Sequence, residues 1–385
     1  MPLALSRRCR QISQSEIRAM SVECERADGL NLAQGVCDTP VPAPVRLGAQ
    51  RAVDEGINSY TRFDGLPKLR TAIANKMDRY NGIKADAESE IIVSSGSTGS
   101  FYSACLALLN PGDEVVLFEP FYGYHLNTLL SVEASPTFVS MRAPDWTFTK
   151  KDLEDAITNK TRAIVVNTPG NPSGKVYTRQ ELQWIADVAI KHDLFVFTDE
   201  IYEYFLYEKR RHISPATLPG MAERTVTISG LSKTFSITGW RIGYSVSNAK
   251  WAQMIGYMND LVYVCAPAPL QAGVAHGLME LDDDYYSGLC QEFAHKREII
   301  CTALADAGLT PCRPQGAYYV LADLSRLPGT SGKERAMQLL KSTGVACVPG
   351  EAFFRDRDKG SRIGRFCFAK TDEELQDACR RLARL

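Results

Sequence analysis

The sequence predicts an α/β fold, because short apolar runs alternate along the chain with amphipathic segments. The runs are apolar on both faces instead of alternating between apolar and polar residues, which is typical of buried parallel strands. In open sheets of this kind, ligands bind outside the carboxyl ends of the strands, so the residues after each run are the first candidates for a functional site. The runs lie at residues 91–94, 114–118, 163–166, 194–198 and 225–229.

The amphipathic segments carry helix signals. Thr178 with Glu181, and Thr371 with Glu374, form capping-box patterns, which predict a helix beginning after each threonine. A further helix is predicted at residues 66–80 because its apolar residues fall on one face. That face consists of Leu66, Leu69, Ile73, Met77 and Tyr80.

The alternation of strands and helices weakens after about residue 285. A long helical stretch at 285–307 leads there into expected strands near 318–321 and 365–369. We therefore expect a large domain and a smaller domain built from both ends of the chain. The expected boundaries are 46–284 for the large domain, and 1–45 with 285–385 for the small domain.

Composition argues against several classes of protein. The 385 residues have a net charge of −1, so no long-range field attracts the chain to nucleic acid or to an anionic membrane. No run approaches the ~18 apolar residues of a membrane span, and the first basic residues lack the apolar segment of a secretory signal. The eleven cysteines stand singly, without a CxxC pair or a Cys/His cluster. This pattern favours a reducing cytoplasm and predicts no disulfide framework and no metal site.

Small, hydroxylated and aromatic residues follow the first two strands. SGSTGS at 95–100 opens a helical segment. Its glycines and hydroxyls favour either a phosphate cradle at a helix N-terminus or an ordinary serine-capped helix start. Tyr122 follows the run at 114–118. An aromatic side chain at that point is either part of the core or a plate against which a flat ring stacks.

The next two strand ends carry an amide, a carboxylate and a phenol. Asn171 lies in NTPGNPSG, a turn made rigid by its prolines and glycines. It is either a simple turn residue or a side chain aimed at a ligand oxygen. Asp199 and Tyr202 lie in TDEIY, at the end of the run at 194–198. A carboxylate is costly to bury without a partner, so Asp199 is either a helix N-cap or the partner of a cationic ring nitrogen.

The fifth strand leads into SGLSKTFSITGWRIGY, residues 229–244. Lys233 lies there among small and hydroxylated residues, and Arg241 follows it in the same stretch. Lys233 is either an exposed loop residue or an amine held to react, in which case Arg241 is placed to grip an anion. Together the five strand ends fit one kind of ligand, a flat, phosphorylated aromatic aldehyde with a ring nitrogen.

These segments together resemble the class I/II pyridoxal-phosphate-dependent aminotransferases of fold type I, the aspartate aminotransferase superfamily. The motifs are NPSG, DEIY and SKTFSITGWRIGY, and the likeness runs from NLAQGVCDTPVP at 31–42 to GRFCFAK at 364–370. The resemblance implies a large domain with a mostly parallel seven-stranded sheet flanked by helices, and a smaller α/β domain from the two chain ends. It also implies the cofactor pyridoxal 5′-phosphate.

The resemblance assigns roles around the cofactor ring. Lys233 matches the lysine that forms the Schiff base with the cofactor and later moves the proton. Asp199 matches the carboxylate that pairs with the pyridine nitrogen. Asn171 and Tyr202 match the donors to the phenolic oxygen of the ring, and Tyr122 occupies the stacking position.

The resemblance also assigns residues to the phosphate and the substrate. Tyr60 is similar to a tyrosine that reaches the phosphate in the neighbouring subunit, which implies a homodimer with shared active sites. Arg365 matches the arginine that binds the α-carboxylate of the substrate, with Gly35 and Asn171 beside it. The phosphate-binding positions are Gly96, Ser97, Thr98, Ser232 and Arg241.

The implied reaction is ping-pong transamination, in which an L-amino acid gives up its amino group and a 2-oxo acid takes it. We expect aromatic or other neutral amino acids as donors. One alternative is a pyridoxal-phosphate-dependent β-lyase that cleaves the C–S bond of cysteine conjugates. A more remote alternative is a non-catalytic regulatory domain that binds the same cofactor, which would need a DNA-binding module.

Several polar residues have no assigned role. Arg62 either meets an acidic substrate from the partner subunit or is simply exposed. His125 and His212 are expected to be structural or exposed rather than catalytic. Val36 and Cys37 lie where some relatives carry larger side chains, so the identity of the substrate is left open.

Overall fold

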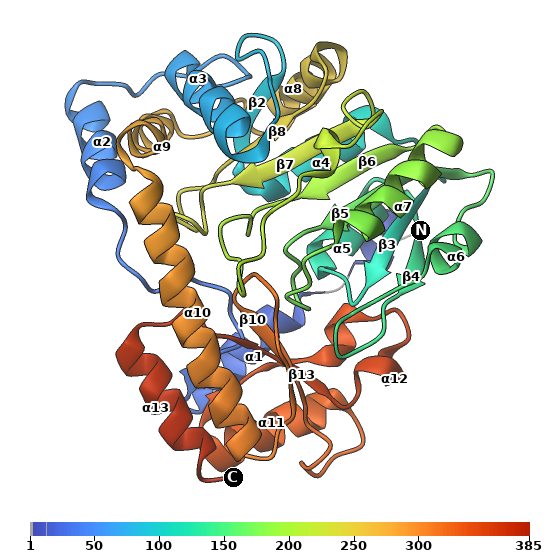
Figure 1. Cartoon of the computed structure of the whole chain (residues 1–385), viewed down its shortest axis with the longest axis vertical. Helices are drawn as coiled ribbons and strands as arrows, with labels where there is room; N and C mark the ends of the chain where they lie inside the picture. The colour runs from blue at the N-terminus through green and yellow to red at the C-terminus, as the bar shows by residue number, and fades with distance from the viewer. Residues whose placement is uncertain (1–2, 13) are drawn as a thin grey trace.

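The computed structural model describes residues 3–12 and 14–385. A seven-stranded sheet flanked by helices forms the upper part of the molecule in Figure 1, and short strands and helices form the lower part. The strands are β1 (Leu30–Asn31), β2 (Ile91–Ser95), β3 (Glu114–Glu119), β4 (Ser135–Ser140), β5 (Thr161–Asn167), β6 (Phe195–Asp199), β7 (Thr225–Gly230), β8 (Ile242–Val246), β9 (Pro311–Cys312), β10 (Tyr319–Asp323), β11 (Val345–Ala346), β12 (Val348–Pro349) and β13 (Ile363–Cys367).

Helices connect most of these strands. The α-helices are α1 (Glu16–Arg26), α2 (Ala43–Asp54), α3 (Pro67–Lys76), α4 (Gly96–Leu108), α5 (Gly123–Ser131), α6 (Lys150–Asp155), α7 (Arg179–Lys191), α8 (Ala249–Tyr263), α9 (Ala268–Glu280), α10 (Asp283–Asp306), α11 (Gly332–Thr343), α12 (Arg357–Gly360) and α13 (Asp372–Leu382). In Figure 1, α10 runs from the upper part of the molecule to the lower part.

The large sheet has the strand order β2-β8-β7-β6-β5-β3-β4. Its pairs from β4 to β7 are parallel, and β8 is antiparallel to both of its neighbours. The five predicted strands are β2, β3, β5, β6 and β7, and the α/β fold class with a mostly parallel seven-stranded sheet is confirmed. The apolar runs did not indicate β4 or β8. The run SPTFVS of β4 begins and ends with exposed serines at the sheet edge, and β8 lies within the motif that follows Lys233.

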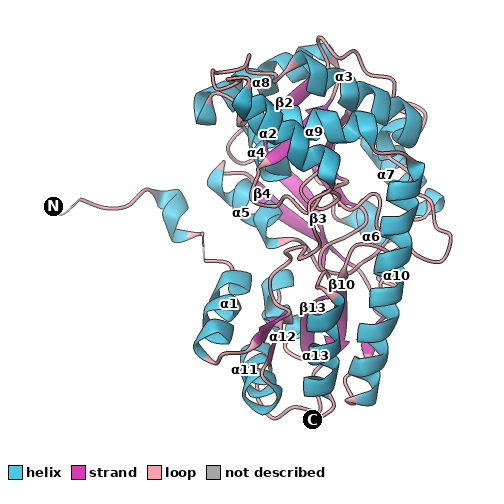
Figure 2. Cartoon of the chain, turned by 90° about the vertical axis from the view of Figure 1, so that its left-hand side faces the viewer, coloured by secondary structure: helices cyan, strands magenta, loops and turns pink. Residues whose placement is uncertain are grey.

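The lower part contains a four-stranded sheet of order β12-β13-β10-β9, and β1 pairs in parallel with β11. Strand β1 comes from the start of the chain and β11 from its last quarter, so both chain ends contribute here. In Figure 2, helices α1, α11, α12 and α13 lie around β10 and β13. The boundaries that divide the chain at residues 45/46 and 284/285 stay a prediction.

Both predicted capping boxes are present. The Thr178 side chain accepts from the Glu181 N–H at the start of α7, and Thr371 accepts from Glu374 at the start of α13. The helix predicted at 66–80 is interrupted, because α3 is followed by a π-helical turn (Met77–Asn81) that ends at a left-handed Gly82. No helix in the described part of the chain combines the length and the apolar character that crossing a membrane requires.

Candidate active site

The carboxyl ends of the central parallel strands lie side by side. Asn167 at the end of β5 pairs with Asp199 at the end of β6, and Asp199 pairs with Ile228 of β7. A cavity of about 1030 Å³ opens at this edge. Eleven of the residues predicted from the sequence line it: Gly35, Ser97, Thr98, Tyr122, Asn171, Asp199, Tyr202, Ser232, Lys233, Arg241 and Arg365.

Lys233 lies at the wall of the cavity, and its Nζ donates to the Gly35 carbonyl oxygen at 3.0 Å. The same carbonyl accepts from the Tyr318 hydroxyl at 3.4 Å, and the amine stands 5.8 Å from the centre of the Tyr318 ring. Burial is the main reason why the pKa of Lys233 lies below its ordinary value, and the cations Arg241 and Arg365 lower it further. A lowered pKa favours the neutral amine, which is the nucleophilic form.

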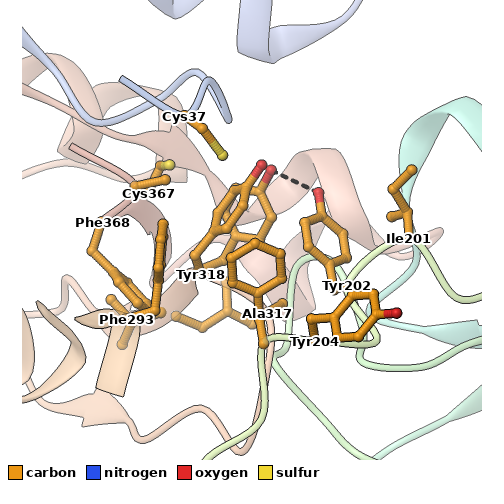
Figure 3. Packing of buried hydrophobic residues seen from close by; sticks show 14 of the residues in the cluster. Cys37, Ile201, Tyr202, Tyr204, Phe293, Ala317, Tyr318, Cys367 and Phe368 are labelled. Carbon is orange, nitrogen blue, oxygen red and sulfur yellow. Dashed lines mark hydrogen bonds between the residues drawn. The ribbon is translucent and has the colours of Figure 1, made fainter. Parts of the chain in front are cut away.

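Two thiols border the same region (Figure 3). The Cys37 Sγ atom lies 3.6 Å from the carbonyl oxygen of Lys233, and Cys367 lies on the same side of Tyr318 as Cys37 in the figure. Burial raises the pKa of Cys37 to about 11 and also raises the pKa of Cys367. Both thiols therefore stay protonated at neutral pH and pack as small apolar side chains.

Asp199 has a partner that the sequence reasoning did not assign. Its Oδ2 lies 2.9 Å from Nε2 of His125, and its Oδ1 accepts from the Ile201 N–H at 3.3 Å. His125 is buried in α5 and lines the cavity. The expectation that His125 is structural or exposed therefore misses its position beside Asp199. The available signal was the spacing of three residues after Tyr122, which brings both side chains to the start of one helix.

Tyr202 is buried and its hydroxyl lies 3.0 Å from the hydroxyl of Tyr319, the contact drawn as a dashed line in Figure 3. Burial holds the pKa of Tyr202 well above its ordinary value, so the phenol remains a hydrogen-bond donor. Tyr319 also explains Gly35, because a Cβ atom at position 35 would lie 1.9 Å from the Tyr319 hydroxyl. Tyr318 and Tyr319 were missed at the sequence level, since they lie at the start of an ordinary apolar strand, with Tyr318 directly before β10.

The glycine and serine segment lies against Arg241. Gly96 has a φ of +71°, and a Cβ atom there would lie 2.3 Å from a terminal nitrogen of Arg241. The Gly96 N–H donates to the Arg241 carbonyl, and Nη1 of Arg241 donates to the Thr238 carbonyl at 2.9 Å. The Ser95 side chain makes no capping bond at the start of α4, so it leaves the first N–H groups of that helix to other acceptors. The Ser232 hydroxyl is buried without a hydrogen-bond partner in the described residues.

Arg365 is fully buried on β13, yet its guanidinium reaches the cavity. One terminal nitrogen donates to Oδ1 of Asn171 at 2.9 Å and the other to the Ala33 carbonyl at 2.6 Å. The guanidinium lies 4.3 Å from the centre of the Tyr319 ring and 5.3 Å from that of Phe353. Asn171 thus uses its oxygen on Arg365, which leaves its NH₂ group as the donor for a ligand.

Tyr60 and Arg62 do not line this cavity. The Tyr60 side chain is 84% exposed. Arg62 pairs with Asp64 at 2.6 Å and lies 3.8 Å from Glu88. His212 lies outside the cavity, where it bonds to Glu200 at 2.6 Å, in agreement with a structural role.

The model of the family described as aminotransferase class I and II matches residues 27–382. Kynurenine–oxoglutarate transaminase 3 of Rattus norvegicus is 35% identical over 378 residues, which cover 91% of this chain and 83% of that protein. Aromatic-amino-acid aminotransferase 2 of Thermococcus litoralis is 31% identical over 386 residues, covering 100% and 98%. The structure of N-succinyldiaminopimelate aminotransferase from Mycobacterium tuberculosis superposes with a TM-score of 0.95 at 33% identity, covering 99% of each chain.

The matched region includes every strand and helix that lines the cavity except α1, which ends one residue before the match begins. The resemblance stated on the three motifs is therefore confirmed over nearly the full chain. The chain belongs to the class I and II aminotransferases and is a transaminase that uses pyridoxal 5′-phosphate and transfers amino groups to 2-oxo acids.

Proposed function

We propose that the cavity at the strand ends is the active site and that Lys233 carries the cofactor. In this proposal Asp199 faces the pyridine nitrogen, and Tyr122 stacks on the ring. Asn171 and Tyr202 donate to the phenolic oxygen of the ring. The phosphate is held by Gly96, Ser97, Thr98, Ser232 and Arg241.

The chemistry of the lining residues fits a phosphorylated pyridine aldehyde. A buried serine hydroxyl without a partner is costly, and Ser232 gains one when a phosphate oxygen lies next to it. The absence of a side chain at Gly96 lets the Arg241 guanidinium lie against the N-terminus of α4, so that a cation and free helix N–H groups stand close together, which favours an anion. The observation that carries the proposal is Lys233, an amine in the cavity whose pKa is lowered by burial.

The bound cofactor supplies an electron sink for the electron pair released at Cα of the amino acid. The protein supplies position and proton transfer. Arg365 orients the α-carboxylate through its two terminal nitrogens, a geometry that a planar guanidinium provides and an ammonium does not. With the cofactor bound, the neutral amine of Lys233 would take the proton from Cα and deliver it to the carbon that bore the aldehyde of the cofactor. The His125 contact holds the Asp199 carboxylate in place.

We further propose aromatic or other neutral amino acids as donors. Phe101, Tyr122, Tyr124 and Tyr319 line the cavity and offer flat apolar surface to an uncharged side chain. The names of two relatives, a kynurenine transaminase and an aromatic-amino-acid aminotransferase, agree with this preference. Product analysis separates transamination from C–S cleavage, because a β-lyase releases pyruvate and ammonia from cysteine conjugates without an oxo-acid acceptor.

The quaternary proposal is a homodimer with shared active sites. Tyr60 is exposed and lies in the segment whose Phe63 ring packs 5.3 Å from Tyr257 of α8. An exposed apolar patch of this kind marks a protein interface, and Tyr60 is free to reach the phosphate in the partner subunit. The exposed large apolar side chains in this segment and along α8 and its C-terminal end are Tyr60, Met254, Tyr257, Leu261, Val262 and Val264.

Two further expectations remain proposals. We place the protein in the cytoplasm, because all eleven cysteines are free thiols. We also propose that residues 46–284 form the large domain, and that 1–45 with 285–385 form the small one, since β1 from the start of the chain pairs with β11.

The test is reduction of the holoenzyme with borohydride, followed by peptide mapping. We expect the cofactor to be fixed on Lys233 alone, and Lys233→Ala to leave no labelled peptide. A label on any other lysine would overturn the assignment of the site.

A further inference from the structure

Two phenols that line the cavity are hydrogen-bonded to each other. The hydroxyl oxygens of Tyr202 and Tyr319 lie 3.0 Å apart, and both side chains are buried. The two ring planes meet at 84°, with 5.7 Å between the ring centres. Tyr202 follows β6 of the large sheet, whereas Tyr319 begins β10 of the four-stranded sheet. The contact therefore joins the two sheets at the cavity wall.

Three contacts hold the Tyr319 side chain in place. The guanidinium of Arg365 lies 4.3 Å from the centre of its ring, in agreement with the antiparallel pairing of β10 and β13, which places the two residues diagonally on one face. The Tyr319 hydroxyl lies against the backbone of Gly35, where a Cβ atom would come within 1.9 Å. Its one hydrogen-bond partner among the residues that the structure describes is the Tyr202 hydroxyl. A phenol fixed in this way can orient a neighbouring hydroxyl.

The number of protons in the pair determines the direction of this hydrogen bond. Within the protein alone, either hydroxyl can donate to the other. A phenol has a single O–H group to donate. Under the proposed function, on which this inference rests, Tyr202 donates its proton to the phenolic oxygen of the cofactor. The Tyr202 oxygen can then only accept in its contact with Tyr319, so Tyr319 is the donor.

We infer that Tyr319 is a positioning residue, whose hydroxyl donates to Tyr202 and thereby directs the Tyr202 O–H group at the phenolic oxygen of the bound cofactor. A hydroxyl that accepts a hydrogen bond is itself a stronger donor, because successive hydrogen bonds polarise one another. The two phenols thus form a relay of two donors. The ring of Tyr319 acts separately, because it lies against the guanidinium of Arg365.

The test is a pH titration of the visible absorbance of the holoenzyme, which reports protonation of the nitrogen through which Lys233 holds the cofactor. We expect Tyr319→Phe to raise the pKa of this nitrogen by about 0.2 to 0.6, since one charge-assisted hydrogen bond loses its cooperative strengthening. The pKa rises because a weaker donor leaves more negative charge close to the nitrogen, which favours its protonated form. Tyr202→Phe removes the donor itself and should raise the pKa by more than about 1.

A second readout separates the hydroxyl of Tyr319 from its ring. Tyr319→Phe keeps the ring beside Arg365, so the apparent Kd for the amino acid in the first half-reaction should change by less than about twofold. Tyr319→Leu also removes the ring, and it should raise this Kd by about 3- to 10-fold because the guanidinium loses the surface that orients it. Both values come from stopped-flow absorbance at a pH above the pKa of the nitrogen in every variant.

Tyr207→Phe is the matched control. Tyr207 is also buried, its hydroxyl donates to the carbonyl of Ala317, and its side chain does not line the cavity. This variant removes one buried phenolic hydroxyl from the same region and leaves the contact between Tyr202 and Tyr319 unchanged. Its titration curve should coincide with that of the wild type.

The possible results separate this inference from the proposed function. An unchanged pKa in Tyr319→Phe, together with a raised pKa in Tyr202→Phe, would contradict the relay alone. A titration curve that neither variant changes would contradict the placement of Tyr202 at the phenolic oxygen, and the relay with it. A pKa that falls in Tyr319→Phe would overturn the direction of the bond, because Tyr319 would then compete with the cofactor for the proton of Tyr202.

Discussion

At the scale of single residues, the chemistry of the site depends on which groups surround its buried ionisable side chains. Lys233 stands against an aromatic ring and a carbonyl, with no carboxylate bonded to its amine among the residues that the structure describes, and burial lowers its pKa. Asp199 is also buried, but it has His125 at 2.9 Å. The amine is thereby poised to lose its proton, while the carboxylate keeps a hydrogen-bonded partner. The surroundings of the buried amine thus favour its neutral form, whereas the surroundings of the buried carboxylate provide it with a hydrogen-bond partner.

The contacts of Arg365 lead to a prediction at this scale. We expect Arg365→Lys to lower kcat/KM for amino acids by at least about 10-fold, because an ammonium cannot hold a carboxylate and Asn171 in one planar fork. The measurement is the absorbance change of the first half-reaction in stopped flow.

The control for Arg365→Lys is the spectrum of the bound cofactor, which should keep its colour. Arg357→Lys, an exposed arginine on α12, should behave as the wild type. A colourless Arg365→Lys protein would instead assign this arginine to cofactor binding.

At the scale of elements, the end of β6 joins two environments. Asp199 and Tyr202 line the cavity, whereas Glu200 and Glu203 enter a buried polar cluster that does not line it. In that cluster Lys76 Nζ lies 2.5 Å from Glu203, and His212 lies 2.6 Å from Glu200. The cluster ties the end of β6 to the end of α3 and thereby fixes the turn that directly follows Asp199.

The Lys76–Glu203 pair gives the second prediction. We expect Lys76→Met to lower the free energy of unfolding by about 3–5 kcal/mol, because it leaves the Glu203 carboxylate buried without its cation. Urea denaturation of the holoenzyme measures this. Lys68→Met, at an exposed lysine on the same helix, should change stability by less than about 0.5 kcal/mol.

The effect of Lys76→Met should also depend on pH. Burial alone would raise the pKa of Glu203, but Lys76 and His212 bring it below its ordinary value of 4.5. A carboxylate with a lowered pKa stabilises the fold above the unfolded pKa, and this stabilisation is lost as the pH falls through the folded pKa. The difference between wild type and Lys76→Met should therefore shrink in acid. A difference that grows in acid would contradict this reading of the pair.

At the scale of the whole molecule, the cavity is assembled from distant parts of the chain. Gly35 precedes the large sheet, Lys233 follows one of its strands, and Arg365 comes from the four-stranded sheet. The bond between Arg365 and Asn171 spans 194 residues of sequence. Relative motion of the two sheets would therefore change the shape of the site directly.

The proposal that two chains share their active sites leads to a prediction about mixed dimers. We expect Tyr60→Phe to raise the Kd for the cofactor about 10-fold through loss of one charge-assisted hydrogen bond to phosphate. In a mixed dimer of Tyr60→Phe and Lys233→Met chains, one site combines the intact Tyr60 with the intact Lys233. That site should bind the cofactor with wild-type affinity and regain activity.

Differently tagged chains, co-expressed and purified through both tags, give the mixed dimer for this measurement. Titration with the cofactor then gives the number of sites per dimer that bind it with wild-type affinity. If the mixed dimer has no higher cofactor affinity and activity than the Tyr60→Phe protein, the active sites are not shared. If light scattering shows a monomer, the dimer itself is contradicted.

Much of the fold and the site could be predicted because the relevant signals are local. Buried strands are continuous apolar runs, and the capping boxes of Thr178 and Thr371 need only four neighbouring residues. The missed strands β4 and β8 lack such a run, and the π-helical turn after α3 has no sequence signal of its own. The sequence also indicates the site residues Asn171, Asp199 and Lys233, because each is a polar residue that closely follows an apolar strand.

The sequence by itself determined the α/β class, the motif residues at the strand ends and, through them, the family of the enzyme. Tertiary structure decided the pairing of His125 with Asp199, which are 74 residues apart, the contact of Tyr319 with Gly35, and the hydrogen bond between Tyr319 and Tyr202. The physical reason is the separation along the chain of the residues that interact. Strand runs, caps and turns follow from interactions between near neighbours, whereas contacts across the fold exist only once the whole chain has been packed.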